Sequence, residues 1–247
     1  MTNEELNGVV VTKLMERWLI DPVFIECSTI VLNNTLPGKY ANYREWYERF
    51  APQMMHYYSP CNAKDLRGLK VSGLTLLKEG FFTDACLSHA DFSSSHLIGS
   101  RFQNAILHFA NFTGAHLEWV QMSPIYAHMA DFTDAVIEGG FFQSAGPMVL
   151  PHCSLFTMTK MVRVKANKAA FDRCDFKGSD MRGAVFSDCD FRKADFRYIS
   201  TDADTRFINC DFENAIFQDH EPVRVYLENE TAFQNCTGMD SIQWIFC

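Results

Sequence analysis

The stretch AFDRCDFKGSDMRGAVFSDCDFRKADF, from Ala170 to Phe196, carries a large apolar residue at every fifth position. These residues are Phe171, Phe176, Met181, Phe186, Phe191 and Phe196. A helix places its apolar residues three and four apart, and a half-buried strand places them two apart, so a period of five fits neither element. The residue two positions before each large one is small, and the residue between them is often Asp. This regularity indicates an internal repeat.

The same period runs through the preceding part of the chain, where a large residue again follows Ala or Ser by two positions. It sets the positions of Leu87, Phe92, Leu97, Phe102, Leu107, Phe112 and Leu117. The units ADFSS, ANFTG, ADFTD, CDFKG, CDFRK and ADFRY resemble the pentapeptide repeat family, whose unit is A(D/N)LXX or its Phe variant. The resemblance covers more than half of the 247 residues.

This resemblance implies a right-handed quadrilateral β-helix, in which each pentapeptide forms one side and four sides complete a coil. Residues twenty apart then stack on one face, and Phe92, Phe112 and Phe132 have this spacing. We therefore expect a mainly β protein whose solenoid covers residues 61–217, with a small helical region before it. Stacked coils would lie about 4.8 Å apart, so the large residues would form continuous interior ladders.

Two changes of phase interrupt the repeat. The array that ends at Phe142 and the array that starts at Phe156 are offset by four residues, and GPMVLP at residues 146–151 is the expected insertion, because two prolines and a glycine exclude regular pairing. A slip of one residue is expected near TDADT at residues 201–205. Two interpretations stay open for both interruptions: an insertion that the fold merely tolerates, or a loop that binds a partner. The interior ladder predicted from these offsets is Phe92, Phe112, Phe132, Phe156, Phe176, Phe196 and Phe217.

The first sixty residues differ in kind from the repeat. Thr2 and Glu5 have the spacing of a capping box ahead of a helix-spaced apolar series, which predicts a helix over residues 3–19. ANYREWYERF has a second capping spacing and an aromatic stripe. We expect residues 1–60 to form either a helical cap for the open end of the solenoid or a partner-binding module.

The last thirty residues, 218–247, lose the repeat and end in IQWIF. This apolar terminus suits either a cap for the last coil or a dimer contact, as the family resemblance implies for several members that pair tower ends. The residues of such a homodimer contact would be Ile242, Trp244 and Phe246.

The composition of the chain limits the cellular compartments in which we expect it to function. No apolar run reaches the roughly 20 residues of a membrane span, and MTNEELNG lacks the basic start and apolar core of a signal peptide. We expect a cytoplasmic protein, or one secreted by a dedicated system without a cleavable signal peptide. Cys174, Cys189 and Cys210 occupy the small inward position of the repeat, so we expect packed thiols rather than disulfides.

The sequence carries no CxxC, HExxH or GxSxG pattern, so no enzyme activity, cofactor or metal site is predicted. The many Asp residues fall at the outward repeat position, where Asx-type bonds to the backbone are expected. His96 and His116 are twenty residues apart and should project side by side. Whether this pair binds a metal or senses pH stays open.

Charge is banded along the repeat. Residues 80–145 hold six acids and one base, residues 146–200 hold six acids and ten bases, and residues 201–247 hold nine acids and two bases. The best-known branch of the family resembles DNA in size and negative charge and binds DNA gyrase or topoisomerase IV. A basic belt would repel the DNA-binding saddle of a topoisomerase, so we rank this function second.

We predict instead a non-enzymatic scaffold that binds another protein, with no direct binding of nucleic acid. The layout resembles bacterial secreted effectors of the family, and a cytosolic regulator is equally compatible with it. The predicted partner contacts are Met148, Val149 and Leu150 in the loop and Lys165, Lys168 and Lys177 in the basic belt.

Overall fold

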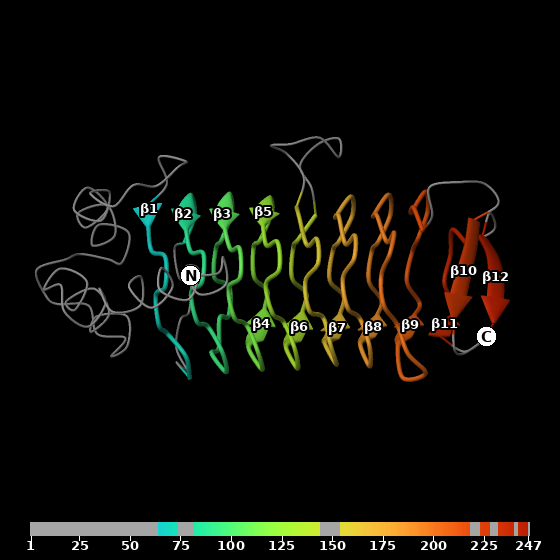
Figure 1. Ribbon diagram of the computed structural model, residues 1–247, viewed down its shortest axis with the longest axis horizontal. Coiled ribbons are helices and arrows are strands. Elements are labelled where there is room, and N and C mark those ends of the chain that lie inside the picture. Colours follow the sequence, from blue (N-terminus) through green and yellow to red (C-terminus); the bar gives the residue numbers. More distant parts are fainter. Residues whose placement is uncertain are drawn as a thin grey trace, which may run out of the picture.

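The structure is a computed structural model that describes residues 64–73, 82–143, 154–217, 223–227, 232–239 and 242–246. The described residues wind as a parallel β-helix and include no α-helix (Figure 1). The helical region expected over residues 1–60 and the loop with Met148, Val149 and Leu150 lie outside the described residues.

Two rows of short strands run along opposite edges of the solenoid (Figure 1). One row consists of β1 (Lys64–Asp65), β2 (Ala85–Cys86), β3 (Ala105–Ile106) and β5 (Ile125–Tyr126). The other consists of β4 (His116–Glu118), β6 (Val136–Glu138), β7 (Lys165–Asn167), β8 (Val185–Ser187), β9 (Arg206–Ile208) and β11 (Phe233–Gln234). A separate parallel pair consists of β10 (Val223–Leu227) and β12 (Ile242–Phe246).

On the other two sides of each coil, neighbouring coils are joined by isolated β-bridges between single residues. We name the side with β2, β3 and β5 face A, and the following sides face B, face C and face D in chain order. Face B is bridged through Asp91, Asn111 and Asp131, and face D through Arg101 and Gln121. Face C carries the second row of strands. From Cys86 to Phe141 bridged partners are twenty residues apart, which confirms a four-sided coil with five residues per side. The first described coil is one residue longer, because Lys64 pairs with Ala85 and Lys70 with Asp91.

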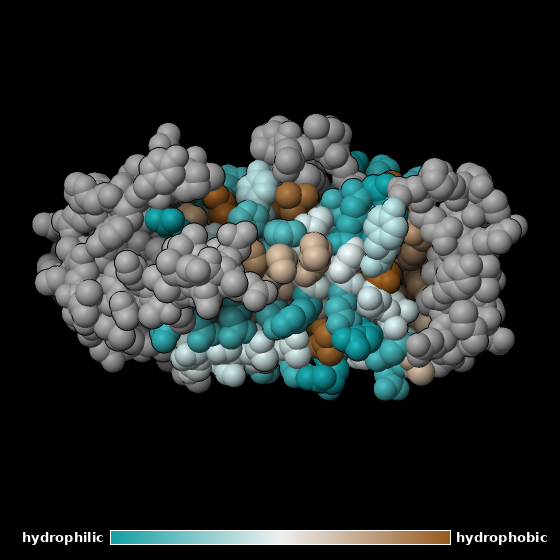
Figure 2. All heavy atoms as spheres, in the orientation of Figure 1, coloured by the Kyte–Doolittle hydropathy of each residue, from teal (hydrophilic) through white to brown (hydrophobic). Residues whose placement is uncertain are grey.

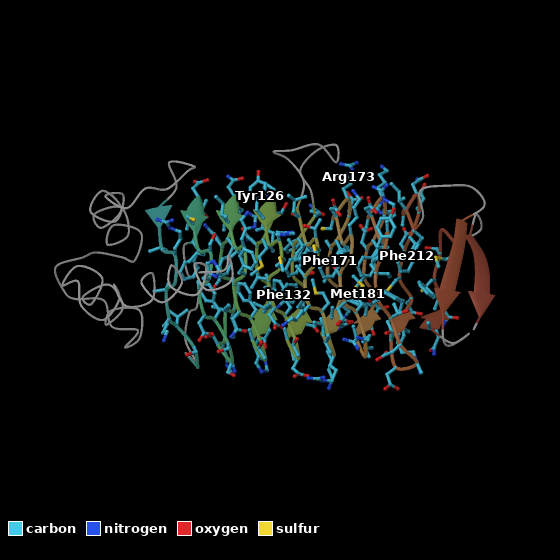
Figure 3. All side chains as sticks on the ribbon, in the orientation of Figure 1. Tyr126, Phe132, Phe171, Arg173, Met181 and Phe212 are labelled. Atoms are coloured by element: carbon cyan, nitrogen blue, oxygen red, sulfur yellow. The ribbon has the colours of Figure 1, made fainter. Side chains whose placement is uncertain are left out.

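Phenylalanines fill the interior as continuous ladders. Phe92, Phe112 and Phe132 are fully buried, and their rings stack with centroids 5.0 and 4.8 Å apart. Figure 3 shows Phe132 and Phe171 between the two edges, inside the coils. Parallel rings one coil apart keep van der Waals contact at the β-sheet spacing, so each added coil extends the same apolar core.

The predicted ladder is wrong at the step from Phe132 to Phe156. Asp131 pairs with Lys160 and Tyr126 with Leu155, so partners across the insertion are 29 residues apart. Phe132 therefore stacks on Met161, while Phe156 continues the face A ladder. The phase of a five-residue repeat defines an insertion only modulo five. The offset of four residues read from the sequence therefore corresponds to an insertion of four residues plus one pentapeptide, nine residues in all.

The one-residue slip predicted near residues 201–205 is confirmed. Asp180 pairs with Ser200 at a spacing of twenty, whereas Val185 pairs with Arg206 at twenty-one. Stacking also continues beyond Phe217, because β11 pairs with β9 and the ring of Phe233 stacks on Phe207 at 4.8 Å. The solenoid therefore reaches into residues 218–247, which were expected to form a C-terminal cap or a dimer contact.

Most of the described corners turn through one residue in the left-handed conformation, two positions after the interior residue. Examples are Ser94, Asn104 and Gly114, with φ between 55° and 65°. This position suits glycine and asparagine, because other side chains crowd the backbone there. The corner closes with a bond such as that from the Ala90 amide to the Leu87 carbonyl, 2.9 Å long.

Several small polar side chains at the inward corner position bond to the coil beneath. The Ser179 hydroxyl donates to the Phe156 carbonyl at 2.7 Å, and the Cys174 thiol to the Phe142 carbonyl at 3.1 Å. Cys189 and Cys210 lie on neighbouring coils and are free thiols, as expected. Burial of these hydroxyls and thiols is therefore compensated by the carbonyls that the corners present.

Outward aspartates secure the turns on the other side of the backbone. The Oδ1 atom of Asp190 accepts a bond from the Arg192 amide, and the Arg192 guanidinium binds the same carboxylate with two nitrogens. Asp180 and Asp195 repeat this arrangement with Arg182 and Arg197. The predicted Asx-type role of the aspartates is confirmed.

Substituting Ala for Phe112 or Phe109 compares an inside with an outside phenylalanine three residues apart. Phe112 is fully buried, whereas Phe109 is 46% exposed. We expect Phe112→Ala to lower the free energy of unfolding by about 3–5 kcal/mol, as for other buried aromatic truncations. Phe109→Ala should change it by under about 0.5 kcal/mol. Equal losses in chemical denaturation would contradict the inside–outside assignment.

Loop deletions test the register across the insertion. Removing the nine residues 144–152 restores the five-residue phase and the twenty-residue coil, so we expect one cooperative thermal transition close to that of wild type. Removing only residues 146–149 restores the five-residue phase but leaves one extra five-residue side in the chain. This deletion should therefore lower the melting temperature more than the nine-residue deletion does. A four-residue deletion that melts higher than the nine-residue deletion would show that the register is wrong.

Candidate protein-binding surface

An apolar row runs along the corner between faces A and B. Phe109, Met129 and Met158 occupy the left-handed position of this corner on three consecutive coils. Their side chains are 46, 43 and 55% exposed. We call these three residues the corner stripe. On the neighbouring coils the same corner carries His89 and Gly178.

The corner stripe is unfavourable for the fold in two respects. A left-handed backbone costs a non-glycine residue roughly 1 kcal/mol, and the turn itself would be served better by Gly or Asn. Exposure of a Phe and two Met side chains to water adds a further cost, because burial would stabilise them. Neither the turn nor the core therefore accounts for these side chains.

The outward residues of face A extend the apolar surface beside the corner stripe. Ile106, Tyr126 and Leu155 are bridged to one another on the same three coils and are half-buried. Tyr126 points outward at the upper edge of the solenoid in Figure 3. We call these three residues the face A flank. Figure 2 shows hydrophobic patches between polar residues on the described coils of one side of the molecule.

His108 and His128 lie between the corner stripe and the face A flank, and His89 continues the row of the corner stripe by one coil. The His89 ring stacks flat on Phe109 at 4.9 Å, and the His108 and His128 rings meet edge to face at 6.1 Å. The Nδ1 atom of His128 is 2.7 Å from the Thr157 hydroxyl, whereas the Nδ1 atom of His108 is buried without a partner. Burial, followed by repulsion from His128 and His89, lowers the pKa of His108; burial also lowers the pKa of His89. These two rings are therefore neutral at pH 7.

Another exposed aromatic side chain has a structural explanation. Trp119 is 56% exposed at the corner after face C, but its ring covers Gly139 of the next coil so closely that a Cβ there would lie 2.5 Å from it. Glycine makes this close approach to the backbone feasible. Met158 also lies over a glycine, but less closely, because a Cβ at Gly178 of the next coil would lie 3.4 Å from the Met158 Cγ atom. Phe109 and Met129 face Met129 and Met158 on the next coils instead of a glycine, so covering the backbone does not account for the corner stripe as a whole.

The three predicted lysines do not converge on one patch. Lys165 starts β7 on face C, Lys168 lies at the corner after face C, and Lys177 lies on face A at the opposite edge. Lys177 also contacts the carboxylates of Asp175 and Asp195, at 3.5 and 3.2 Å. Their role in partner binding stays a prediction.

The basic belt is largely neutralised by neighbouring acids. Lys160 lies 3.1 Å from Asp131, and Arg163 binds Asp134 through two nitrogens at 2.7 Å. Both pairs join a base of the basic segment, residues 146–200, to an acid of the acidic segment, residues 80–145, on the preceding coil. Burial alone would raise the pKa of Asp131, but bonds from Thr133 and Lys160 hold it below its ordinary value. Opposite charges therefore meet where the bands adjoin.

The histidine pair on face C has the predicted geometry. His96 and His116 are bridged, and their ring centroids lie 4.4 Å apart. Across the described residues, no group of three or more His, Cys, Asp or Glu side chains could hold a metal ion. The two rings are tilted by 56° to each other, and two histidines without a third ligand give no basis for assigning a metal here.

At the C-terminal end, β12 pairs in parallel with β10, so that Trp244 lies opposite Val225. The homodimer contact through Ile242, Trp244 and Phe246 stays a prediction. Within the part of the chain that the structure describes, no helix is long and apolar enough to cross a membrane.

A titration of His108 tests the electrostatics of this surface. We expect its midpoint by NMR to lie below the ordinary value of about 6.5. Because the folded pKa is lowered, His108 stabilises the fold fully above the unfolded pKa, and this contribution is lost as the pH falls through the folded pKa. His108→Gln should therefore weaken the acid destabilisation of wild type. Identical stability–pH profiles, or a midpoint above 6.5, would contradict the burial of this ring.

The family model "Pentapeptide repeats" matches eight copies, over residues 83–123 and 160–198. No curated protein matches the chain.

Several solved structures are similar to this chain at low sequence identity. QnrB1, a plasmid-mediated fluoroquinolone resistance protein, is 16% identical over 70% of this chain and 89% of its own, with a TM-score of 0.43. HetL from the cyanobacterium Nostoc, involved in regulation of heterocyst differentiation, is 16% identical over 70% of this chain and 80% of its own, with a TM-score of 0.34. A thylakoid-lumen protein of Arabidopsis thaliana is 23% identical over 57% of this chain and 70% of its own, with a TM-score of 0.28. On these matched repeat units and its four-sided parallel coils, the described part of this chain is a pentapeptide-repeat β-helix.

Proposed function

We propose that this chain is a non-enzymatic scaffold that binds another protein through the corner stripe and the face A flank. The observation that carries the proposal is the corner stripe itself. Three bulky apolar residues are exposed on consecutive coils in a backbone conformation that disfavours them. Exposed apolar side chains that gather in one place are typical of interaction sites.

The solenoid is suited to this role because its coils hold side chains at fixed intervals. Each amide of the corner stripe bonds to the next coil; for example, the Met158 amide donates to the Lys177 carbonyl at 2.8 Å. A partner therefore meets a preorganised surface and little entropy is lost in ordering the backbone on binding. Extended binding surfaces of this kind are the general use of repeat proteins.

The alternative is a DNA-mimicking protein that binds gyrase or topoisomerase IV. Such a mimic needs a line of carboxylates free to replace phosphates. Within the described coils, Asp180, Asp190 and Asp195 each bind an arginine of their own repeat unit through two nitrogens. These pairs weaken the case for mimicry, and we rank the scaffold first.

The chain acts as a cytosolic regulator or as a bacterial effector secreted without a cleavable signal peptide. Met148, Val149 and Leu150 add apolar contacts from the loop that follows face D, and Lys165 and Lys168 add charge on the opposite side of the solenoid. These contacts would let one partner wrap around the coils or two partners bind at once.

Replacing Met129 and Met158 with Asn separates binding from folding. Asn accepts the left-handed conformation, so the free energy of unfolding should stay equal or rise by up to about 1 kcal/mol. Affinity-tagged wild type purified from the producing cell should retain a partner that the double variant loses by about tenfold or more, as for central interface residues. Ser94→Asn, at another corner, is the matched control and should retain the partner.

Two results would contradict the proposal. Loss of stability in the double variant would show that the methionines serve the fold. Equal recovery of the partner with both proteins would place the binding surface elsewhere. Recovery of gyrase or topoisomerase IV, lost at raised salt, would favour the alternative.

A further inference from the structure

We propose that the corner stripe and the face A flank dock an amphipathic α-helix of the partner, with its axis along the axis of the solenoid. This inference rests on the proposed function and specifies the partner's element. The six side chains form two columns over three coils, with His108 and His128 between the columns.

Backbone saturation excludes strand addition on this side of the molecule. The Phe109 amide bonds to the His128 carbonyl at 3.1 Å, and the Met129 amide to the Thr157 carbonyl at 3.0 Å. The strand residues beside them bond to the next coil in the same way, as in the 2.7 Å bond from Leu107 to Tyr126. An added strand would find no free ladder group here. The partner must therefore bring an element that satisfies its own backbone, which a helix does.

The spacing of the coils also suits a helix. The stacked rings of His89 and Phe109 show a repeat of 4.9 Å along this corner. A helix advances about 5.4 Å per turn, whereas same-side residues of a strand lie nearly 7 Å apart. Over the two steps from Phe109 to Met158 the helix drifts by only about 1 Å. Unbranched methionines absorb such a mismatch, because they adopt many rotamers at low cost.

The chemistry of the surface indicates an apolar docking face with no net charge. Burial lowers the pKa of His108 and of His89, and thus keeps both rings uncharged. Beyond Met158, the corner continues with Gly178, and the charges on face A, such as Lys177 and Asp195, are paired with each other. The stripe is thus about two helical turns long, which fits apolar residues at i, i+3 or i+4, and i+7.

A selection from a library of displayed random 16-residue peptides tests this assignment. Full-length wild type is the target, and Met129→Lys is the counter-selection. Lysine fits this position, because Lys168 and Lys193 adopt the same left-handed conformation at other corners. Ser94→Lys is the matched control. We expect enriched peptides to carry apolar residues at i, i+3 or i+4, and i+7. They should also gain helical circular dichroism on binding, and bind Met129→Lys about tenfold more weakly than Ser94→Lys.

Enriched peptides with a two-residue apolar period, or with clustered acids and strong salt dependence, would overturn the helix assignment. So would failure to enrich any peptide that discriminates against Met129→Lys. If the Asn variants of Met129 and Met158 still lose the cellular partner, the scaffold function survives this failure. A wild type that sediments as a dimer while Met129→Lys is a monomer would identify a second copy as the occupant and also overturn the proposal.

Discussion

The hydrogen bond from each coil to the next is the interaction on which the rest of the structure depends. Bonds such as that from Phe112 to Asp131, 2.7 Å long, hold the coils in register, and the register alone decides which side chains stack. With the coils in register, large residues meet large residues inside, and Phe92, Phe112 and Phe132 form one stack. In the described coils the same bonds engage the ladder groups of the four sides, so recognition of a partner there falls mainly to side chains. Because the interior positions of the repeat accept few residue types, the residues vary mainly at the outward positions.

The sequence predicted the fold because the fold is local and periodic. A five-residue period, a small residue at the inward corner and an outward Asp have one consistent geometric solution, and the structure confirms it. The insertion was misjudged because a period reports position only modulo five, and Phe156 is a suitable residue on either ladder. Only pairings across the insertion, such as that of Asp131 with Lys160, distinguish nine extra residues from four. The one-residue slip had no such ambiguity and was placed correctly.

The candidate site was harder to predict than the fold. Sequence reasoning selected an apolar loop and a cluster of lysines, because hydrophobic and charged runs are visible along the chain. The structure distributes the lysines over opposite sides and pairs several belt residues with aspartates. The corner stripe was visible in principle, since Phe109, Met129 and Met158 each follow an interior position by two, where turn-forming residues are expected. Recognising the three as one row required the nine-residue insertion, without which Met158 does not align with Met129.

The central claim is that the corner stripe is exposed for a partner rather than for the fold. Oxidative footprinting of methionines tests it directly, because the chain contains its own controls. Met129 and Met158 are 43 and 55% exposed, whereas Met122, Met161 and Met181 are fully buried. In the purified protein only the first two should oxidise rapidly among these five. In the producing cell the account predicts that Met129 and Met158 become protected, while the three interior methionines stay unreactive. Equal oxidation of Met129 and Met158 in the cell and in the purified protein would contradict it.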